Sequence, residues 1–366
     1  MPPTATTITT ATASLVDLEV ETVRTDAIQS FLKQETIFVE LGTADGLAGR
    51  GYSYTIGTGG RAVLSMLRET LLPAVIGLDS RAVERVWRAA FDSSRATTVG
   101  PITSLALAAL DTAIWDLRCL RDAQPLWLAA GGFRDTVPLY DTEGGWLHLG
   151  TDELVENALR AKAQGWSGVK LKVGRPSARE DAERVGAVRD AVGPGMAVMV
   201  DANQSLTLAS ARARTALLEP FDLTWYEEPM PAEDVTAHAE LVRSTSVPIA
   251  VGESIYSVGQ FKEYLQRGAA GIVQTDVARI GGITPWLKVA HLAEAFNVTV
   301  CPHFLMELHV SLTAAIPNGG FVEHIPQLRA ITTSSLRIVD GHAVVPDEPG
   351  LGIAWDLDAI EDRRVA

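Results

Sequence analysis

Residues 168–174 read Gly-Val-Lys-Leu-Lys-Val-Gly. This pattern predicts an apolar strand that carries charge near its end, and it gives the clearest indication of the fold. Side chains alternate across a strand, so Val169 and Leu171 face one side while Lys170 and Lys172 face the other. Later apolar runs also end on ionisable residues: Asp201, Glu227, Glu253, Asp276, His303 and Glu323. Counted from Lys172, each of these residues follows the one before it by 29, 26, 26, 23, 27 and 20 residues in turn. A strand, a helix and two loops occupy about that length in a parallel array. The spacing predicts an α/β chain of the (β/α)8-barrel type, with these strand ends gathered at one mouth.

The chain divides into four predicted parts. Residues 1–14, rich in Thr and Ala, are expected to form a flexible tail, and residues 15–136 show the mixed strand and helix pattern of an α+β domain. Residues 137–340 alternate strand and helix and form the barrel. Residues 341–366 have too little periodicity for another βα unit and are expected to pack back on the first domain.

Composition limits the possible partners. The chain of 366 residues is 47% apolar and 21% charged, with a net charge of −14, which argues against a nucleic-acid partner. Two cysteines provide no disulfide framework, and the N-terminus lacks the pattern of a signal peptide. No apolar run is long enough to span a bilayer. These features predict a cytoplasmic protein without a membrane partner, in which any anion site needs a local concentration of positive charge.

Three of the strand-end residues are carboxylates: Asp201, Glu227 and Glu253. One such acid alone is more simply explained as a helix cap or a surface ion pair. Three that converge would repel one another unless a cation lay between them. Hard oxygen ligands suit Mg²⁺, with Mn²⁺ as the alternative. The three acids are therefore predicted to bind a divalent metal ion.

The remaining ionisable strand ends suit acid/base chemistry. Asp276 lies one strand before His303, where it would orient the imidazole and favour its charged form. Glu323 would donate a hydrogen bond to an oxyanion only with a raised pKa. Lys172, crowded by a metal and by Lys170, would have a lowered pKa and act as a base. With Lys170 and the metal supplying positive charge, the set predicts removal of a proton α to a carboxylate, through an enediolate. The lysines alone would also fit a solvated edge strand.

The ordered motifs resemble the mandelate racemase subgroup of the enolase superfamily over essentially the whole chain. They are Lys-x-Lys at 170–172, Asp-Ala-Asn at 201–203, Tyr-Glu-Glu-Pro at 226–229, Gly-Glu-Ser at 252–254, Asp276, and Pro-His-Phe at 302–304. The resemblance implies an N-terminal α+β capping domain and a modified (β/α)7β barrel of the TIM type. It implies Mg²⁺ on Asp201, Glu227 and Glu253, with the catalytic roles on Lys172, Lys170, His303, Asp276 and Glu323.

Longer segments at 168–176, 275–285 and 302–309 are similar to acid-sugar dehydratases, especially those acting on galactarate and talarate. This implies a lyase (hydro-lyase) of carbohydrate catabolism that converts an aldonate or aldarate to a 2-keto-3-deoxy acid, with Lys172 removing the α-proton and His303 protonating the departing β-hydroxyl. An isomerase of the same superfamily is the alternative: a racemase, an epimerase, or a cycloisomerase of a sugar acid or lactone. A non-catalytic barrel is the remaining alternative. The family also implies a homo-oligomer, often an octamer.

Substrate selection in this superfamily lies in two cap loops, here expected at residues 25–33 and 52–60. The first contains no Arg or His for a distal carboxylate, which argues against a diacid. Asn203, Tyr54 and Lys170 are the residues predicted to bind a small carboxylate substrate.

Overall fold

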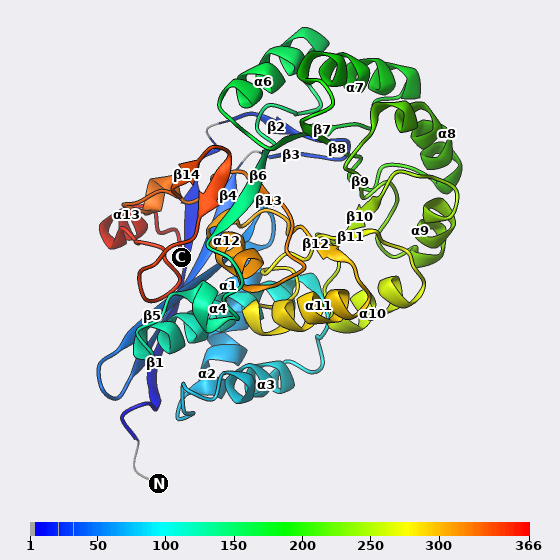
Figure 1. The fold of residues 1–366 in the computed structure, drawn as a ribbon. Coiled ribbons are helices and arrows are strands. Elements are labelled where there is room, and N and C mark those ends of the chain that lie inside the picture. The colour runs from blue at the N-terminus through cyan, green and yellow to red at the C-terminus, as the bar shows by residue number, and fades with distance from the viewer. Residues whose placement is uncertain (1–3, 21, 32) are drawn as a thin grey trace.

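The computed structural model describes residues 4–20, 22–31 and 33–366 and combines a barrel with a smaller sheet (Figure 1). The barrel strands are surrounded by a ring of helices, and the smaller sheet stands against one side of that ring with helices of its own. Among the described residues, no helix is both long enough and apolar enough to cross a membrane.

The smaller sheet contains three antiparallel strands in the order β1–β4–β5: β1 (Ile8–Leu18), β4 (Gln34–Thr43) and β5 (Ala48–Thr55). Helix α4 (Pro101–Arg121) lies across β5, and Gly51 allows the two backbones to approach closely. A Cβ added at Gly51 would stand 2.7 Å from the carbonyl oxygen of Ala109, so a larger residue does not fit there.

Strand β1 begins earlier than the sequence predicted. Residues 8–14, expected to belong to a flexible tail, pair with β4 in a ladder that runs from Ile8 opposite Thr43 to Leu18 opposite Gln34. The prediction is therefore wrong for residues 8–14. Thr9, Thr10 and Thr12 are exposed there and only Ile8 and Ala13 are buried, so the segment has little apolar signal although its backbone is paired. Residues 1–3 of the predicted tail lie outside the described residues.

A short hairpin and several helices complete the N-terminal part. The hairpin pairs β2 (Arg24–Thr25) with β3 (Ser30–Phe31). The helical elements are α1 (Gly60–Met66), the π-helical turn η1 (Leu67–Leu71), α2 (Leu72–Val75), α3 (Val83–Ser93), α4 and α5 (Leu126–Ala129). The first three follow one another without a break.

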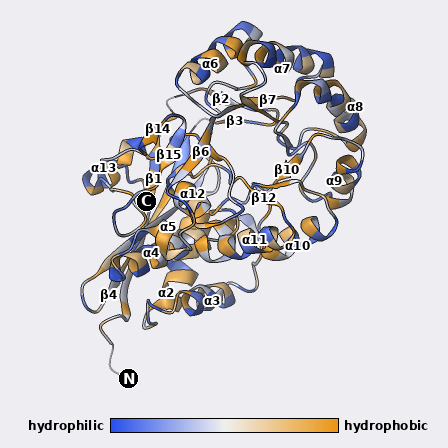
Figure 2. Cartoon of the chain, viewed as in Figure 1, coloured by the Kyte–Doolittle hydropathy of each residue, from blue (hydrophilic) through white to orange (hydrophobic). Residues whose placement is uncertain are grey.

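The predicted (β/α)7β barrel is confirmed. Its parallel strands, with β13 paired to β6, are β6 (Thr136–Asp141), β7 (Gly168–Lys172), β8 (Ala197–Asp201), β9 (Trp225–Glu227), β10 (Ile249–Val251), β11 (Ile272–Val273), β12 (Thr299–Val300) and β13 (Val322–His324). The connecting helices are α6 (Thr151–Ala163), α7 (Ala178–Val192), α8 (Leu208–Leu218) with the 3₁₀ turn η2 (Glu219–Phe221), α9 (Val235–Val242), α10 (Val258–Gln266), α11 (Ile283–Ala295) and α12 (Met306–Ala315). A parallel bridge between Val300 and Gly319 joins β12 to the segment before β13. Figure 2 shows apolar residues along the barrel strands and mixed faces on the ring helices.

The alternation of side chains along the strands positions the site. A buried interior cluster fills the barrel at one level: Tyr140, Met199, Trp225, Ala250 and Cys301. Two residues further along three of these strands lie Asp201, Glu227 and His303, which therefore face the same interior near the carboxyl ends. The register of β7, β8 and β9 places Lys172 opposite Asp201 and Asp201 opposite Glu227.

The last residues of the chain contact both parts of the fold. They contain the 3₁₀ turn η3 (Arg329–Ile331), β14 (Ile338–Val339), β15 (His342–Val344) and α13 (Leu357–Asp362). Strand β15 pairs antiparallel with β6 of the barrel. Beyond it, the Trp355 ring packs edge-on against Phe38 of β4 at 5.1 Å, and the backbone N–H of Leu15 donates to the carbonyl of Ala366 at 2.9 Å.

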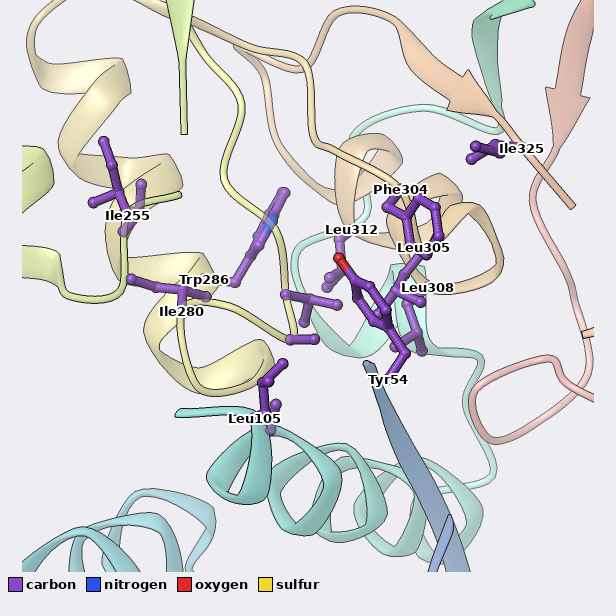
Figure 3. Packing of buried hydrophobic residues seen from close by; sticks show 14 of the residues in the cluster. Tyr54, Leu105, Ile255, Ile280, Trp286, Phe304, Leu305, Leu308, Leu312 and Ile325 are labelled. Atoms are coloured by element: carbon purple, nitrogen blue, oxygen red, sulfur yellow. The ribbon is translucent and has the colours of Figure 1, made fainter. Parts of the chain in front are cut away.

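The junction between the two parts is apolar and closely packed (Figure 3). The ring of Tyr54, at the end of β5, lies 4.5 Å from the ring of Phe304, which follows β12. Asp111 of α4 accepts hydrogen bonds from the backbone N–H and the hydroxyl of Thr284, both at 2.8 Å. The hydrogen bonds from Thr284 fasten the first turn of α11 to helix α4, and the loop that precedes α11 contains Asp276.

Candidate active site

The three carboxylates predicted to bind a metal come together at the carboxyl ends of β8, β9 and β10. One oxygen from each of Asp201, Glu227 and Glu253 lies within 4.8 Å of the others. Asp201 and Glu227 are fully buried, whereas the Glu253 side chain is 13% exposed. Glu253 follows the end of β10, so that the cluster opens toward the mouth of the barrel at this residue.

The donor set fits Mg²⁺. All three groups are carboxylates, which hard divalent cations prefer, and Oε2 of Glu253 is buried without a hydrogen-bond partner among the described residues. Burial and the neighbouring acids raise the pKa of Glu227 to about 7 against the attraction of Lys170. Burial also opposes the ionisation of Asp201, but Lys172 and Lys170 hold its pKa below the ordinary value. Three acids this close require positive charge among them, and a divalent cation supplies it.

Lys170 lies beneath the carboxylates and is 1% exposed. Its Nζ is 3.0 Å from Oε1 of Glu227 and 2.9 Å from Oε1 of Glu323. Burial favours the neutral amine, but these carboxylates outweigh it and raise the pKa of Lys170 well above its usual range. Lys170 is therefore a fixed positive charge at the floor of the site.

Lys172 lies nearer the mouth, in contact with Oδ2 of Asp201 and 5.4 Å from the centre of the Trp146 ring. The lowered pKa predicted for Lys172 is not what the structure shows. Burial favours the neutral amine, yet the charges of Asp201, Glu253 and Glu227 together outweigh burial and the repulsion from Lys170, and the pKa is raised. A cation held by Asp201 acts on Lys172 in the opposite direction.

His303 and Asp276 form the predicted pair. Nδ1 of His303 is 2.9 Å from Oδ2 of Asp276, and its Nε2 is 3.4 Å from Oε2 of Glu253. Burial opposes the ionisation of Asp276, but His303 and Arg279 lower its pKa to about 2. Burial likewise disfavours imidazolium, whereas Glu253 and Asp276 raise the pKa of His303. Nδ1 therefore faces Asp276, and Nε2 is the ring nitrogen that faces Glu253 of the metal-binding cluster.

Glu323 lies in the site as expected, but it lacks the raised pKa that donation to an oxyanion would require. Its Oε1 accepts a hydrogen bond from the Thr142 hydroxyl at 2.7 Å, and its Oε2 accepts one from the backbone N–H of Phe304 at 3.0 Å. Burial acts to raise the pKa, but Lys170 and His303 lower it far below its ordinary value. An ionised Glu323 accepts hydrogen bonds and holds Lys170, so it does not donate one to an oxyanion.

The residues predicted to bind substrate differ in what their polar atoms do. Within the part of the chain that the structure describes, Oδ1 of Asn203 is buried without a hydrogen-bond partner, and the backbone N–H of Asn203 donates to Asp201 at 2.8 Å. The hydroxyl of Tyr54 instead donates to Oδ2 of Asp276 at 2.7 Å and lies 3.3 Å from Nε of Arg279. Tyr54 therefore orients Asp276, while Asn203 retains a free acceptor beside the metal ligands.

Several site residues were missed by sequence reasoning. The side-chain amide of Gln274 donates to Oε2 of Glu227 at 2.7 Å, and the guanidinium of Arg279 donates to the Tyr256 hydroxyl at 3.0 Å. Gln274 lies two residues before Asp276, so the alternation of side chains already indicated it. Trp146 and Asp26 come from loops, where no periodic pattern points to them.

A capped (β/α)7β barrel with a carboxylate metal centre at its mouth defines a class of metal-dependent barrel enzymes. The chain belongs to the enolase superfamily: the family model described as Enolase C-terminal domain-like matches residues 153–359, and that of the mandelate racemase / muconate lactonizing enzyme N-terminal domain matches residues 10–129. These matches confirm the resemblance seen in the motifs. The predicted Mg²⁺ site is supported as well, by the cluster of Asp201, Glu227 and Glu253 and by related structures solved with Mg.

Individual relatives match over most of their length. The chain is 35% identical over 327 residues to the 3,6-anhydro-alpha-L-galactonate cycloisomerase of Streptomyces coelicolor, covering 89% of this chain and 90% of the relative. It is 34% identical over 323 residues to the L-talarate/galactarate dehydratase of Salmonella typhimurium, covering 88% and 81%. The crystal structure of L-talarate dehydratase from Polaromonas sp. JS666, complexed with Mg and L-glucarate, superposes with a TM-score of 0.94 at 36% identity, covering 98% of each chain.

Proposed function

We propose that this protein is a Mg²⁺-dependent dehydratase that converts a sugar acid, an aldonate or aldarate, to a 2-keto-3-deoxy acid through an enediolate. The observation that carries the proposal is the position of two proton-transfer groups at opposite ends of the carboxylate cluster. Lys172 contacts Asp201 at one end, and Nε2 of His303 is 3.4 Å from Glu253 at the other. Such a pair suits removal of a proton on one side of a substrate and delivery of one on the other.

On the lysine side, Nζ of Lys172 accepts the α-proton as the neutral amine. The Cα–H bond breaks, and its electron pair forms the enediolate of the substrate carboxylate. Lys170, held in place by Glu227 and Glu323, adds a fixed positive charge beneath this anion. When bound by Asp201, Glu227 and Glu253, Mg²⁺ supplies the positive charge that makes the α-proton acidic.

On the histidine side, Nε2 of His303 donates its proton to the departing β-hydroxyl. The Cβ–O bond breaks, water leaves, and the resulting enol becomes the 2-keto acid by proton transfer to carbon. Asp276 accepts from Nδ1 at 2.9 Å, and the Tyr54 hydroxyl fixes Asp276 in turn. This chain of contacts keeps Nε2 directed toward the carboxylate cluster.

The test is incubation of the protein with Mg²⁺ and a library of aldonic and aldaric acids, followed by detection of 2-keto acids with semicarbazide. We expect product from at least one acid, and loss of it in Lys172→Ala and His303→Asn. Lys288→Ala and His291→Asn, both exposed and outside the site, serve as controls that retain activity. Failure of every acid to yield a keto acid contradicts the proposal.

An isomerase is the second candidate. Lys172 and His303 on opposite sides serve racemisation, epimerisation or cycloisomerisation equally well, and similarity to a cycloisomerase at 35% identity supports this reading. In D₂O, an isomerase incorporates deuterium at the α-carbon without releasing a keto acid. A keto acid formed together with loss of water favours the dehydratase.

A further inference from the structure

The hairpin of β2 and β3 lies at the mouth of the barrel, beside β7 (Figure 1). The backbone N–H of Leu147 donates to the carbonyl of Thr25 at 3.0 Å, and the Phe31 ring packs edge-on against Trp146 at 5.6 Å. The Trp146 ring in turn lies 5.4 Å from Nζ of Lys172. The hairpin is therefore anchored to the residues that surround the proposed base.

Asp26 is held between these anchors. The next residue, Ala27, packs on Gly174, where an added Cβ would stand 2.7 Å from the Cβ of Ala27. Gly174 lies two residues beyond Lys172 on the same segment. The Asp26 side chain is fixed by its own turn, since Oδ1 accepts hydrogen bonds from the backbone N–H groups of Ile28 at 2.7 Å and Gln29 at 2.8 Å.

The second oxygen of Asp26 has no such partner. Asp26 is only 7% exposed, and its Oδ2 is buried without a hydrogen bond to any residue that the structure describes. The packing of Ala27 on Gly174 places this turn beside the segment that carries Lys172. Burial raises the pKa of Asp26, and the charge of Lys172 offsets this only in part. A buried acceptor with nothing to accept from, at the mouth of a site for a polyhydroxylated acid, points to a hydroxyl group of the substrate.

The basic residues at the two ends of this segment, Arg24 and Lys33, form ion pairs with acidic residues outside the hairpin. The Arg24 guanidinium contacts Glu143 and lies 3.3 Å from the Gln327 side chain. The Lys33 ammonium is 3.1 Å from Asp17 and 3.2 Å from Glu35. Between them, residues 25–31 contain no Lys, Arg or His. Asp26 is therefore the one ionisable residue of this stretch, which offers no positive charge to a distal carboxylate.

We propose that Asp26 determines specificity: its free Oδ2 accepts a hydrogen bond from a hydroxyl group remote from the reacting carboxylate, so the site selects a monocarboxylic sugar acid over a dicarboxylic one. A second carboxylate at that position meets a like charge in a buried setting and lacks a donor. This inference rests on the proposed function, because it names the substrate class of the same site.

The test is the variant Asp26→Asn. Asparagine has the same shape, and its Oδ1 accepts from the same two backbone N–H groups, so the turn and the fold are expected to persist. Its Nδ2 replaces an acceptor by a donor. We expect the ratio of kcat/KM for an aldonate to that for the aldarate of matching stereochemistry to fall at least tenfold.

Gln29→Glu is the matched control, because it adds a carboxylate at an exposed position of the same hairpin. The control should leave the ratio within about twofold of the wild type, since a solvent-exposed charge is screened. Calorimetric titration of the Mg²⁺-loaded protein with the same two acids measures the selection independently of turnover, and we expect the same direction of change.

The outcomes separate this inference from the proposed function. If the wild type dehydrates sugar acids but prefers the aldarate, or if Asp26→Asn leaves the ratio unchanged, the role of Asp26 is overturned and the dehydratase stands. If no sugar acid is converted but the aldonate still binds more tightly than the aldarate and loses that preference in Asp26→Asn, the proposed reaction fails and the specificity role holds. If neither acid binds, both are overturned.

Discussion

Replacing Tyr54 with phenylalanine separates an orienting role from a substrate-binding role. The Tyr54 side chain is buried, with 1% of the residue exposed, and its hydroxyl donates to the ionised Asp276 at 2.7 Å. A hydrogen bond to a charged group contributes about 1.5–3 kcal/mol. If the hydrogen bond stabilises the transition state in which His303 transfers its proton by that amount, its loss lowers kcat roughly 10- to 150-fold. KM should change less than about twofold, because the bond lies behind the reacting groups.

Tyr52→Phe provides the matched control. Tyr52 lies on the same strand and is fully buried, and its hydroxyl makes no hydrogen bond to residues 4–20, 22–31 or 33–366. Removing an unpaired buried hydroxyl is expected to leave kcat unchanged and to alter the free energy of unfolding by less than about 1 kcal/mol. Steady-state kinetics on one sugar acid compare the two variants. A rise in KM at constant kcat in Tyr54→Phe, or equal effects of the two substitutions, would refute the orienting role.

Three further predictions concern the metal site, pH and packing. Glu253→Gln should weaken Mg²⁺ binding by at least about tenfold in calorimetric titration, because it removes an anionic oxygen that accepts no hydrogen bond from the described residues; equal affinity to the wild type would show that Glu253 is not a ligand. Burial raises the pKa of Asp111 to about 7, above its value of about 4 in an unfolded chain, so its stabilising contribution is complete below about pH 4 and is lost as the pH rises through 7. Asp111→Asn should therefore reduce the loss of unfolding free energy between about pH 5 and about pH 8, measured by denaturant titration; an unaltered pH dependence would contradict this assignment. Gly51→Ala should cost about 1–3 kcal/mol of stability, because its Cβ meets the backbone of α4, whereas Gly195→Ala meets nothing within 4 Å and should be neutral; equal melting temperatures for the two variants would be inconsistent with this packing.

The barrel and its strand-end residues could be predicted because periodicity carries that information. An apolar run that ends on Asp201 or Glu227 shows both where the strand stops and which way its last side chain faces. The register of neighbouring strands then brings these residues together. The protonation states could not be predicted in the same way. Glu323 is ionised because Lys170 lies 2.9 Å away, a distance set by packing across the barrel.

The positions of side chains in loops could not be predicted from the sequence either. Asp26 lies in a hairpin whose strands contain two residues each, too short for any periodic pattern. Its position depends on Trp146 and Gly174, which are remote in the chain. The paired threonine-rich start of β1 was missed for a related reason, since β4 rather than local composition holds it in place.

The central claim is that Lys172 removes the α-proton and His303 acts afterwards on the opposite side. The most direct measurement is deuterium incorporation at the α-carbon of a converted sugar acid in D₂O with Mg²⁺, followed by NMR in Lys172→Ala and His303→Asn. We expect that His303→Asn still exchanges the α-proton while forming no keto acid, and that Lys172→Ala exchanges none. Exchange that persists in Lys172→Ala and disappears in His303→Asn would contradict it.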